Sequence, residues 1–169
     1  MNRSDTFTEE ELEVIYNLID TDNLCPPILT AITHASLAVA YGARNIESLN
    51  LQWSHIQIIT DQNGNDIILV KYKRAKAKEA EKWSEITIRG HLQVKIIKTY
   101  MKCFTSQQIE AKDKEGRCRF YRKLQYNKYN KNKIEGTDIV IGKDQFAKMI
   151  QLLADTIGKK SENGNKVKG

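Results

Sequence analysis

Residues 43–53, which read A-R-N-I-E-S-L-N-L-Q-W, combine side chains that could bind and act on a phosphate group. Arg44 follows a glycine-ended apolar stretch and begins a second short helical stretch, with Glu47 one turn later. A planar guanidinium can hold two phosphate oxygens at once, and a helix start adds backbone N–H donors to the same site. An arginine in this position could bind an anion, although Arg44 and Glu47 would also suit an ordinary surface ion pair.

Lysines and arginines gather in two further places along the chain. Residues 71–78 hold five of them, and residues 112–133 hold nine together with only two acidic side chains. Residues 1–40 carry seven acidic side chains and one basic one, so the net charge of +6 is unevenly distributed. Two separate basic clusters favour a nucleic acid as partner, whereas one cluster alone is more often a solvated surface.

Length and composition limit the classes of protein that fit. A chain of 169 residues suits one domain with a hydrophobic core. The sequence has neither an apolar run of about 18 residues nor a signal peptide, so no membrane partner is expected. Cys25, Cys103 and Cys118 are scattered, which indicates reduced thiols rather than disulfides or a zinc site. We expect an intracellular protein of the nucleus or cytoplasm, with no metal or cofactor and with His34 as a core residue.

The pattern around Arg44 resembles the first catalytic-arginine segment of the tyrosine recombinases, the phage-integrase-like family that breaks and rejoins DNA. That segment is roughly G-x-R-x-x-E-L-x-x-L-x-W-x-D-I. Six positions of this chain fall in register with it, and His55 stands where the family usually has aspartate. The matching residues are Gly42, Arg44, Glu47, Leu51, Trp53 and Ile56.

The resemblance implies a reaction in which a tyrosine attacks a DNA phosphodiester and forms a 3′-phosphotyrosine without a metal ion. Arg44 would be the first of two arginines that stabilise the developing negative charge. Lys76 would be the general acid for the leaving oxygen, with Lys73 and Lys78 as competitors for that role. Duplex DNA is the implied partner, on which the full-length protein would self-associate. The residues predicted to bind DNA are Lys73, Arg74, Lys78, Arg119, Arg122 and Lys123.

Other parts of the family's active site have no counterpart in the sequence. None of the three histidines, His34, His55 and His91, has an arginine three residues later, as the family's H-x-x-R box requires. The tyrosines that follow the predicted sheet precede the place where a nucleophile is due; they are Tyr100, Tyr121, Tyr126 and Tyr129. We therefore expect residues 7–158 to form a partial catalytic domain that is inactive alone, followed by a mobile basic tail at 159–169.

Hydrophobic periodicity predicts the elements that position these residues. A capping box at Thr8 and Glu11 begins a first helix that ends near Asp20. An apolar second helix runs from Pro26 to Gly42. Alternating residues predict strands at 56–60, 67–72 and 83–88, with the basic residues 73–82 between the last two strands. Helices are expected at 92–104 and 144–158, and residues 105–142 are irregular by pattern.

The predicted fold class is α+β and mainly α, with helices around a small three-stranded antiparallel sheet. This element order resembles the N-terminal two-thirds of a tyrosine recombinase catalytic domain. The basic insert also resembles the crypton-like transposon recombinases and their domesticated relatives. Two alternatives stay open: a non-catalytic DNA-binding or interaction protein that kept the fold, and a basic RNA-binding protein in which the Arg44 pattern is coincidence.

Overall fold

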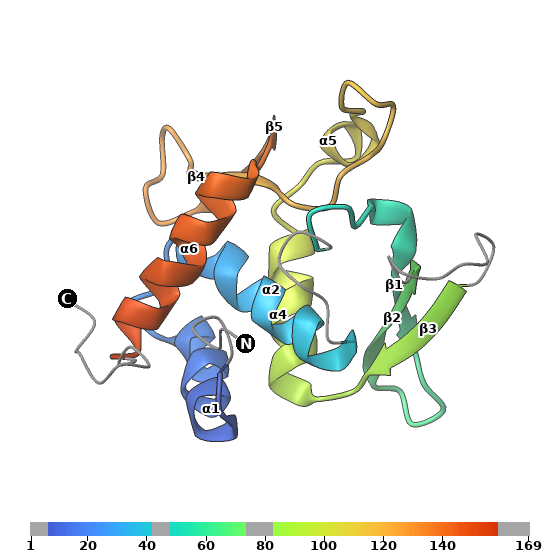
Figure 1. The fold of residues 1–169 in the computed structure, drawn as a ribbon, viewed down its shortest axis with the longest axis horizontal. Helices are drawn as coiled ribbons and strands as arrows, with labels where there is room; N and C mark the ends of the chain where they lie inside the picture. The colour runs from blue at the N-terminus through green and yellow to red at the C-terminus, as the bar shows by residue number, and fades with distance from the viewer. Residues whose placement is uncertain (1–6, 42–47, 74–82, 159–169) are drawn as a thin grey trace.

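The computed structural model describes residues 7–41, 48–73 and 83–158 of the chain. The fold is α+β, as predicted (Figure 1). Its helices are α1 (Glu9–Asn17), α2 (Pro26–Tyr41), α4 (His91–Met101), α5 (Ser106–Glu110) and α6 (Lys143–Thr156), with short 3-10 turns η1 (Leu18–Asp20) and η2 (Trp53–His55). Its strands are β1 (Ile56–Thr60), β2 (Asp66–Lys73), β3 (Trp83–Ile88), β4 (Arg122–Tyr126) and β5 (Ile134–Val140).

Strands β1, β2 and β3 form an antiparallel sheet in that order, which confirms the predicted sheet. Side chains alternate between its two faces because successive residues of a strand point to opposite sides. Ile56 and Val70, which are buried, and Ile86, which is partly buried, form a row in register across all three strands and pack into the hydrophobic core. Gly64, with φ of 82°, lies in the predicted turn between β1 and β2, where a positive φ favours glycine.

Helix α2 occupies the centre of the molecule. Figure 1 shows α2 and α4 between the three-stranded sheet on one side and α6 and β4 on the other. Thr30, Thr33 and Ser36 are buried on α2, and each hydroxyl donates to the carbonyl one turn earlier at 2.7 to 3.3 Å. These bonds satisfy polar atoms inside the core, so an apolar helix can carry hydroxyl residues on its buried sides.

Both terminal helices follow their sequence signals. The N–H of Glu11 donates to Thr8 Oγ1 at 3.1 Å, and the N–H of Thr8 donates to Glu11 Oε1 at 2.8 Å, which confirms the capping box. Helix α6 ends just before Gly158, whose φ is 75°. The predicted tail at 159–169 lies outside the described residues.

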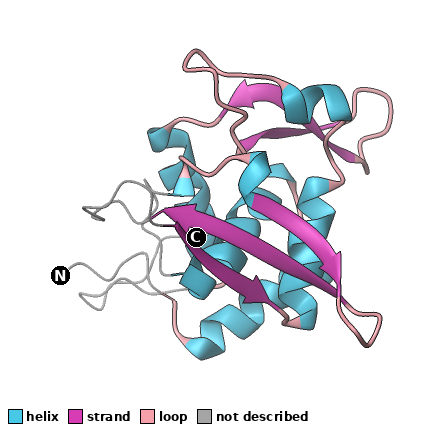
Figure 2. Ribbon diagram, turned by 90° about the vertical axis from the view of Figure 1, so that its right-hand side faces the viewer, coloured by secondary structure: helices cyan, strands magenta, loops and turns pink. Residues whose placement is uncertain are grey.

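The prediction that residues 105–142 are irregular was wrong. This stretch contains α5 and the antiparallel hairpin β4–β5, which Figure 2 shows apart from the three-stranded sheet. A register shift between Arg122 and Leu124 interrupts the alternation of β4, and polar residues are frequent in the hairpin, whose turn 128–133 is exposed. Both features weaken the apolar period on which strand prediction depends.

Buried side chains from α1 to α6 join in one hydrophobic cluster, so the described residues form a single core. His34 lies in this cluster as expected, with its ring centroid 4.8 Å from that of Phe146. None of the described helices is long and apolar enough to cross a membrane.

Candidate nucleic-acid interface

At one end of the three-stranded sheet, the chain enters β1 from the segment that contains Arg44 and leaves β2 for the lysine-rich segment. Strand β1 begins there after the Arg44 segment, and Lys73 at the end of β2 pairs with Trp83 at the start of β3. The rings of His55 and Trp83 meet at this end, with centroids 5.1 Å apart and planes at 61°. We call this region the sheet end and define it by His55, Lys71, Trp83 and Glu85.

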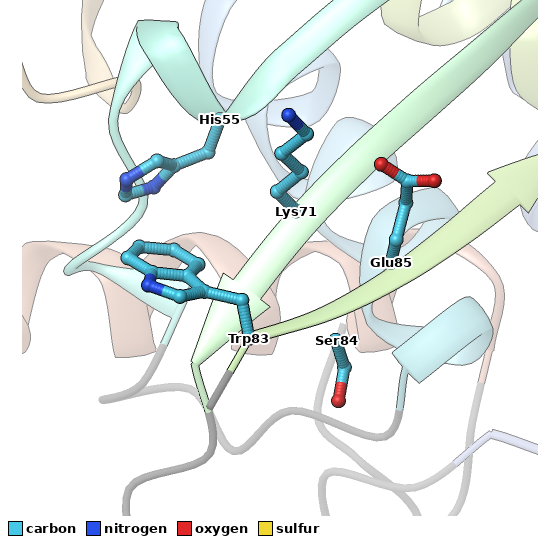
Figure 3. Close-up of a pocket in the computed structure, with 5 residues that line it drawn as sticks. All are labelled: His55, Lys71, Trp83, Ser84 and Glu85. Carbon is cyan, nitrogen blue, oxygen red and sulfur yellow. The ribbon is translucent and has the colours of Figure 1, made fainter. Parts of the chain in front are cut away.

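The sheet end presents a hollow on the solvent-facing side of the sheet. His55, Lys71, Trp83, Ser84 and Glu85 line it, and Figure 3 shows the side chain of Ser84 pointing away from the other four. Lys71 and Glu85 are directly opposed across β2 and β3, and both are exposed. The hollow has a volume of about 610 Å³, and half of the Trp83 surface is open to solvent. It offers a flat aromatic surface beside a cation, a combination suited to a nucleic-acid strand.

The ring of His55 has a backbone partner at this end. Its Nδ1 atom accepts a hydrogen bond from the backbone N–H of Gln52 at 3.2 Å. Partial burial lowers the pKa of His55 below its usual value of 6.5. The ring is therefore neutral at neutral pH, and it brings no negative charge to the position where the recombinase pattern has aspartate.

The chain that follows Arg44 is fixed by a loop from the basic insert. Trp53 N–H donates to the carbonyl of Cys118 at 3.0 Å, and Phe120 N–H donates to the carbonyl of Leu51 at 2.9 Å. Trp53 itself is buried, and its ring lies 4.8 Å from that of Phe120. These contacts couple residues 48–53 to a segment more than sixty positions away, which the sequence pattern did not predict.

Arg119 strengthens this junction. Its Nη1 atom donates to the carbonyl of Leu49 at 2.8 Å and to Asn50 Oδ1 at 2.9 Å. Its Nε atom donates to Asp113 at 2.6 Å, and its Nη2 atom donates to Glu115 at 2.9 Å. Backbone N–H groups of the loop and Arg119 stabilise the ionised carboxylate and lower the pKa of Asp113 to about 2. Arg119 thus holds Leu49 and Asn50 in place, and its exposed fraction of 9% does not fit the predicted DNA contact.

Arg122 has the same kind of role. Only 1% of its surface is exposed, and its guanidinium donates to three backbone carbonyls, those of Arg119, Ala111 and Asp138. All of these partners belong to the loop and hairpin that surround it. The prediction that Arg122 binds DNA is corrected on this ground, because a buried guanidinium with its donors engaged cannot reach a phosphate.

Of the other predicted site residues, the structure describes the side chain of Lys123 alone. Arg44, Arg74, Lys76 and Lys78 lie outside the described residues, as does the side chain of Lys73. Their predicted roles are therefore neither confirmed nor contradicted. Lys123 is exposed on β4 beside α6 and stays a candidate for DNA binding.

A third cationic region, on α4, was missed by the sequence analysis. Arg89 and lysines of α4 surround a hollow of about 720 Å³ beside the β1–β2 turn. Most of these cations have acidic partners: Arg89 with Asp61, Lys98 with Asp66, and Lys95 with Asp20. Helical spacing from Lys95 to Lys98 and Lys102 is the signal that could have predicted it. The described charges of this face are therefore largely paired within the protein.

Comparison with known proteins gives no relative: no protein-family model, curated protein or solved structure matches this chain. Among the described residues, no group of three or more His, Cys, Asp or Glu side chains is arranged to hold a metal ion. Function must therefore be inferred from the residues themselves.

Proposed function

We propose that the chain binds duplex DNA through the sheet end, as part of a DNA breaking-and-rejoining domain of the tyrosine recombinase type. The observation that supports this most is the contact between His55 and Trp83. His55 follows the Arg44 segment in the chain, and Trp83 follows the lysine-rich connection 74–82. Two segments that the family resemblance assigns to phosphate chemistry are thus attached at one end of one sheet.

Charge and exposure agree with this proposal. Lys71 is exposed in the same hollow as Trp83, and in the sequence Arg44 precedes β1 while Arg74, Lys76 and Lys78 follow β2. Lysine and arginine contacts to phosphates supply most of the affinity of non-specific DNA binding. Because such contacts position a protein without identifying bases, little sequence preference is expected.

Strand cleavage by this chain alone is not part of the proposal. The sequence lacks the H-x-x-R box, and the side chains of Tyr100 and Tyr121 are buried in the core. Burial raises the pKa of Tyr100, whose hydroxyl also bonds to Phe120 and Arg122. Neither hydroxyl is open to a DNA phosphate, and a site that loses several cooperating groups loses nearly all of its catalysis.

A competition experiment tests the choice of partner. Labelled duplex DNA is bound to the chain and displaced by unlabelled duplex DNA or by single-stranded RNA of the same length. We expect duplex DNA to displace the probe at a lower concentration than RNA does. Preferential displacement by RNA would contradict the proposal and support the alternative of a basic RNA-binding protein.

A nicked suicide substrate tests the absence of cleavage, because it traps any covalent phosphotyrosine as a shifted band. We expect no trapped product. An adduct that disappears in Tyr126→Phe or Tyr129→Phe would identify a nucleophile in the hairpin and overturn the expected inactivity.

A further inference from the structure

The turn between β4 and β5, residues 127–133, holds an aromatic ring in solvent. We call this turn the hairpin tip. Tyr129 is 89% exposed, the highest value among the large apolar side chains that the structure describes. One exposed apolar residue is common on protein surfaces, so exposure alone does not indicate a site. The ordered backbone and the positive charges around Tyr129 distinguish it from an ordinary exposed apolar residue.

Asparagine side chains fix the backbone of the hairpin tip. Asn127 Oδ1 accepts hydrogen bonds from the N–H groups of Tyr129 at 2.8 Å and Asn130 at 2.9 Å. Asn130 Oδ1 accepts from the N–H of Asn132 at 3.0 Å, and Asn127 N–H donates to the carbonyl of Lys133 at 2.7 Å. The turn is therefore ordered before any partner binds, which reduces the entropy cost of binding.

Three lysines lie on the same turn as the exposed ring. The ammonium of Lys128 lies 5.7 Å from the centroid of Tyr129, and Lys131 and Lys133 are exposed on the same turn. The neighbouring carboxylate is engaged within the hairpin, because Glu135 accepts from Asn127 at 2.6 Å and from Gln125 at 3.2 Å. No ion pair involving the three lysines occurs among the described residues, in contrast to the paired cations of α4.

We propose that the hairpin tip binds unpaired nucleotides of DNA, with a base stacked on Tyr129 and the neighbouring phosphates bound by Lys128, Lys131 and Lys133. An aromatic ring accepts any base because every base has a flat π face, and lysines follow the sugar–phosphate backbone. This inference rests on the proposed DNA-binding function and adds a second contact with a preference for single-stranded DNA next to a duplex.

The position of the hairpin tip agrees with a contact separate from the sheet end. In Figure 1, β4 lies on the opposite side of α2 and α4 from β3. DNA bound at the sheet end therefore leaves the hairpin tip free to bind another part of the same DNA molecule, such as a single-stranded end. Substitutions can therefore test the two surfaces independently, since different exposed residues belong to each.

The test uses a duplex with a single-stranded overhang that contains one 2-aminopurine, and a fully paired duplex of equal length. Stacking of 2-aminopurine on an aromatic ring quenches its fluorescence. We expect quenching by the wild-type chain and by Tyr129→Phe, which keeps the ring. Tyr129→Ala should abolish the quenching and weaken overhang binding about tenfold, while binding of the paired duplex changes little.

A set of charge-matched variants tests the lysines. Lys128→Gln, Lys131→Gln and Lys133→Gln together should make the salt dependence of overhang binding shallower, by about 2 in the slope of log K against log salt. The control replaces exposed lysines at other sites, Lys102→Gln, Lys112→Gln and Lys114→Gln, with the same loss of charge. Equal effects of the two sets would show that total charge matters rather than the hairpin tip.

Three results would overturn this inference: equal affinity for overhang and paired duplex, quenching that survives in Tyr129→Ala, or equal effects of the two lysine sets. If paired duplex DNA still binds in those cases, the proposed function stands and only the hairpin contact fails. If neither DNA binds, the proposed function fails with it. Circular dichroism checks that Tyr129→Ala is folded, which is expected because the side chain it removes is 89% exposed.

Discussion

At the scale of single residues, neighbouring basic side chains of β4 have opposite environments. Arg122 is buried and donates to backbone carbonyls, whereas Lys123 is exposed. Arg122→Met should lower the free energy of unfolding by about 3 kcal/mol, because it leaves buried carbonyl groups without donors. Lys123→Met is the matched control and should change it by less than about 0.5 kcal/mol.

Chemical denaturation of both variants measures this difference. DNA affinity of the folded Arg122→Met protein should equal that of the wild type, since the guanidinium does not reach the surface. A variant of normal stability with reduced DNA binding would contradict the structural role of Arg122.

His55 makes a prediction about pH. Its pKa in the folded protein is below that of the unfolded chain because the ring is partly buried. The unfolded chain therefore binds a proton first as the pH falls below about 6.5, and stability decreases between that pH and the folded pKa. In His55→Asn, whose amide oxygen can replace Nδ1 as acceptor for Gln52, this part of the decrease should disappear.

The free energy of unfolding, measured from pH 7.5 to pH 5, decides the point. The carboxylates whose pKa is lowered, among them Asp66 and Asp113, lose their contribution at lower pH as they become protonated, so the two effects are separable. Identical profiles for the wild type and His55→Asn would show that His55 is not the titrating group.

At the scale of elements, a glycine allows the β4–β5 hairpin to lie against the end of α4. A Cβ atom at Gly136 would come 2.2 Å from the ring of Phe104, and Gly136 N–H donates to the carbonyl of Cys103 at 2.8 Å. Gly136→Ala should lower the free energy of unfolding by about 2 kcal/mol because the ring must move. Gly142→Ala, whose Cβ would meet nothing within 4 Å, is the control and should cost less than about 1 kcal/mol.

Thermal or chemical unfolding of both glycine variants checks this prediction. An equal loss in the two variants would mean that chain flexibility, and not contact with Phe104, explains the effect. Since the hairpin includes the proposed second contact, a loosened hairpin should also reduce 2-aminopurine quenching more than paired-duplex binding.

Sequence patterns predicted the elements with strong apolar periods and missed those held together by polar contacts. The capping box at Thr8, the apolar α2 and the three strands of the main sheet all follow from local spacing. The β4–β5 hairpin does not, because a register shift and polar side chains hide its period. For the same reason Arg119 and Arg122 were assigned to DNA: no local pattern distinguishes a buried arginine with backbone partners from an exposed one.

At the scale of the whole molecule, four groups of basic side chains differ in how their charges are used. The cations of α4 are mostly paired with Asp20, Asp61 and Asp66. Arg119 and Arg122 hold loops together. The sheet end and the hairpin tip present cations beside exposed aromatic rings, Trp83 and Tyr129, on opposite sides of the central helices. Only the last two are therefore proposed to bind DNA.

The central claim is that duplex DNA binds at the sheet end, and a salt titration with matched variants tests it most directly. The affinity for paired duplex DNA is measured at several salt concentrations for the wild type, for Arg44→Gln with Lys71→Gln and Lys76→Gln, and for the control Lys102→Gln with Lys112→Gln and Lys114→Gln. The wild-type affinity should fall steeply with salt. The triple variant of Arg44, Lys71 and Lys76 should reduce the slope of log K against log salt by about 2 to 3, while the control keeps the wild-type slope. A flat wild-type response, or equal slopes for the two variants, would contradict the claim.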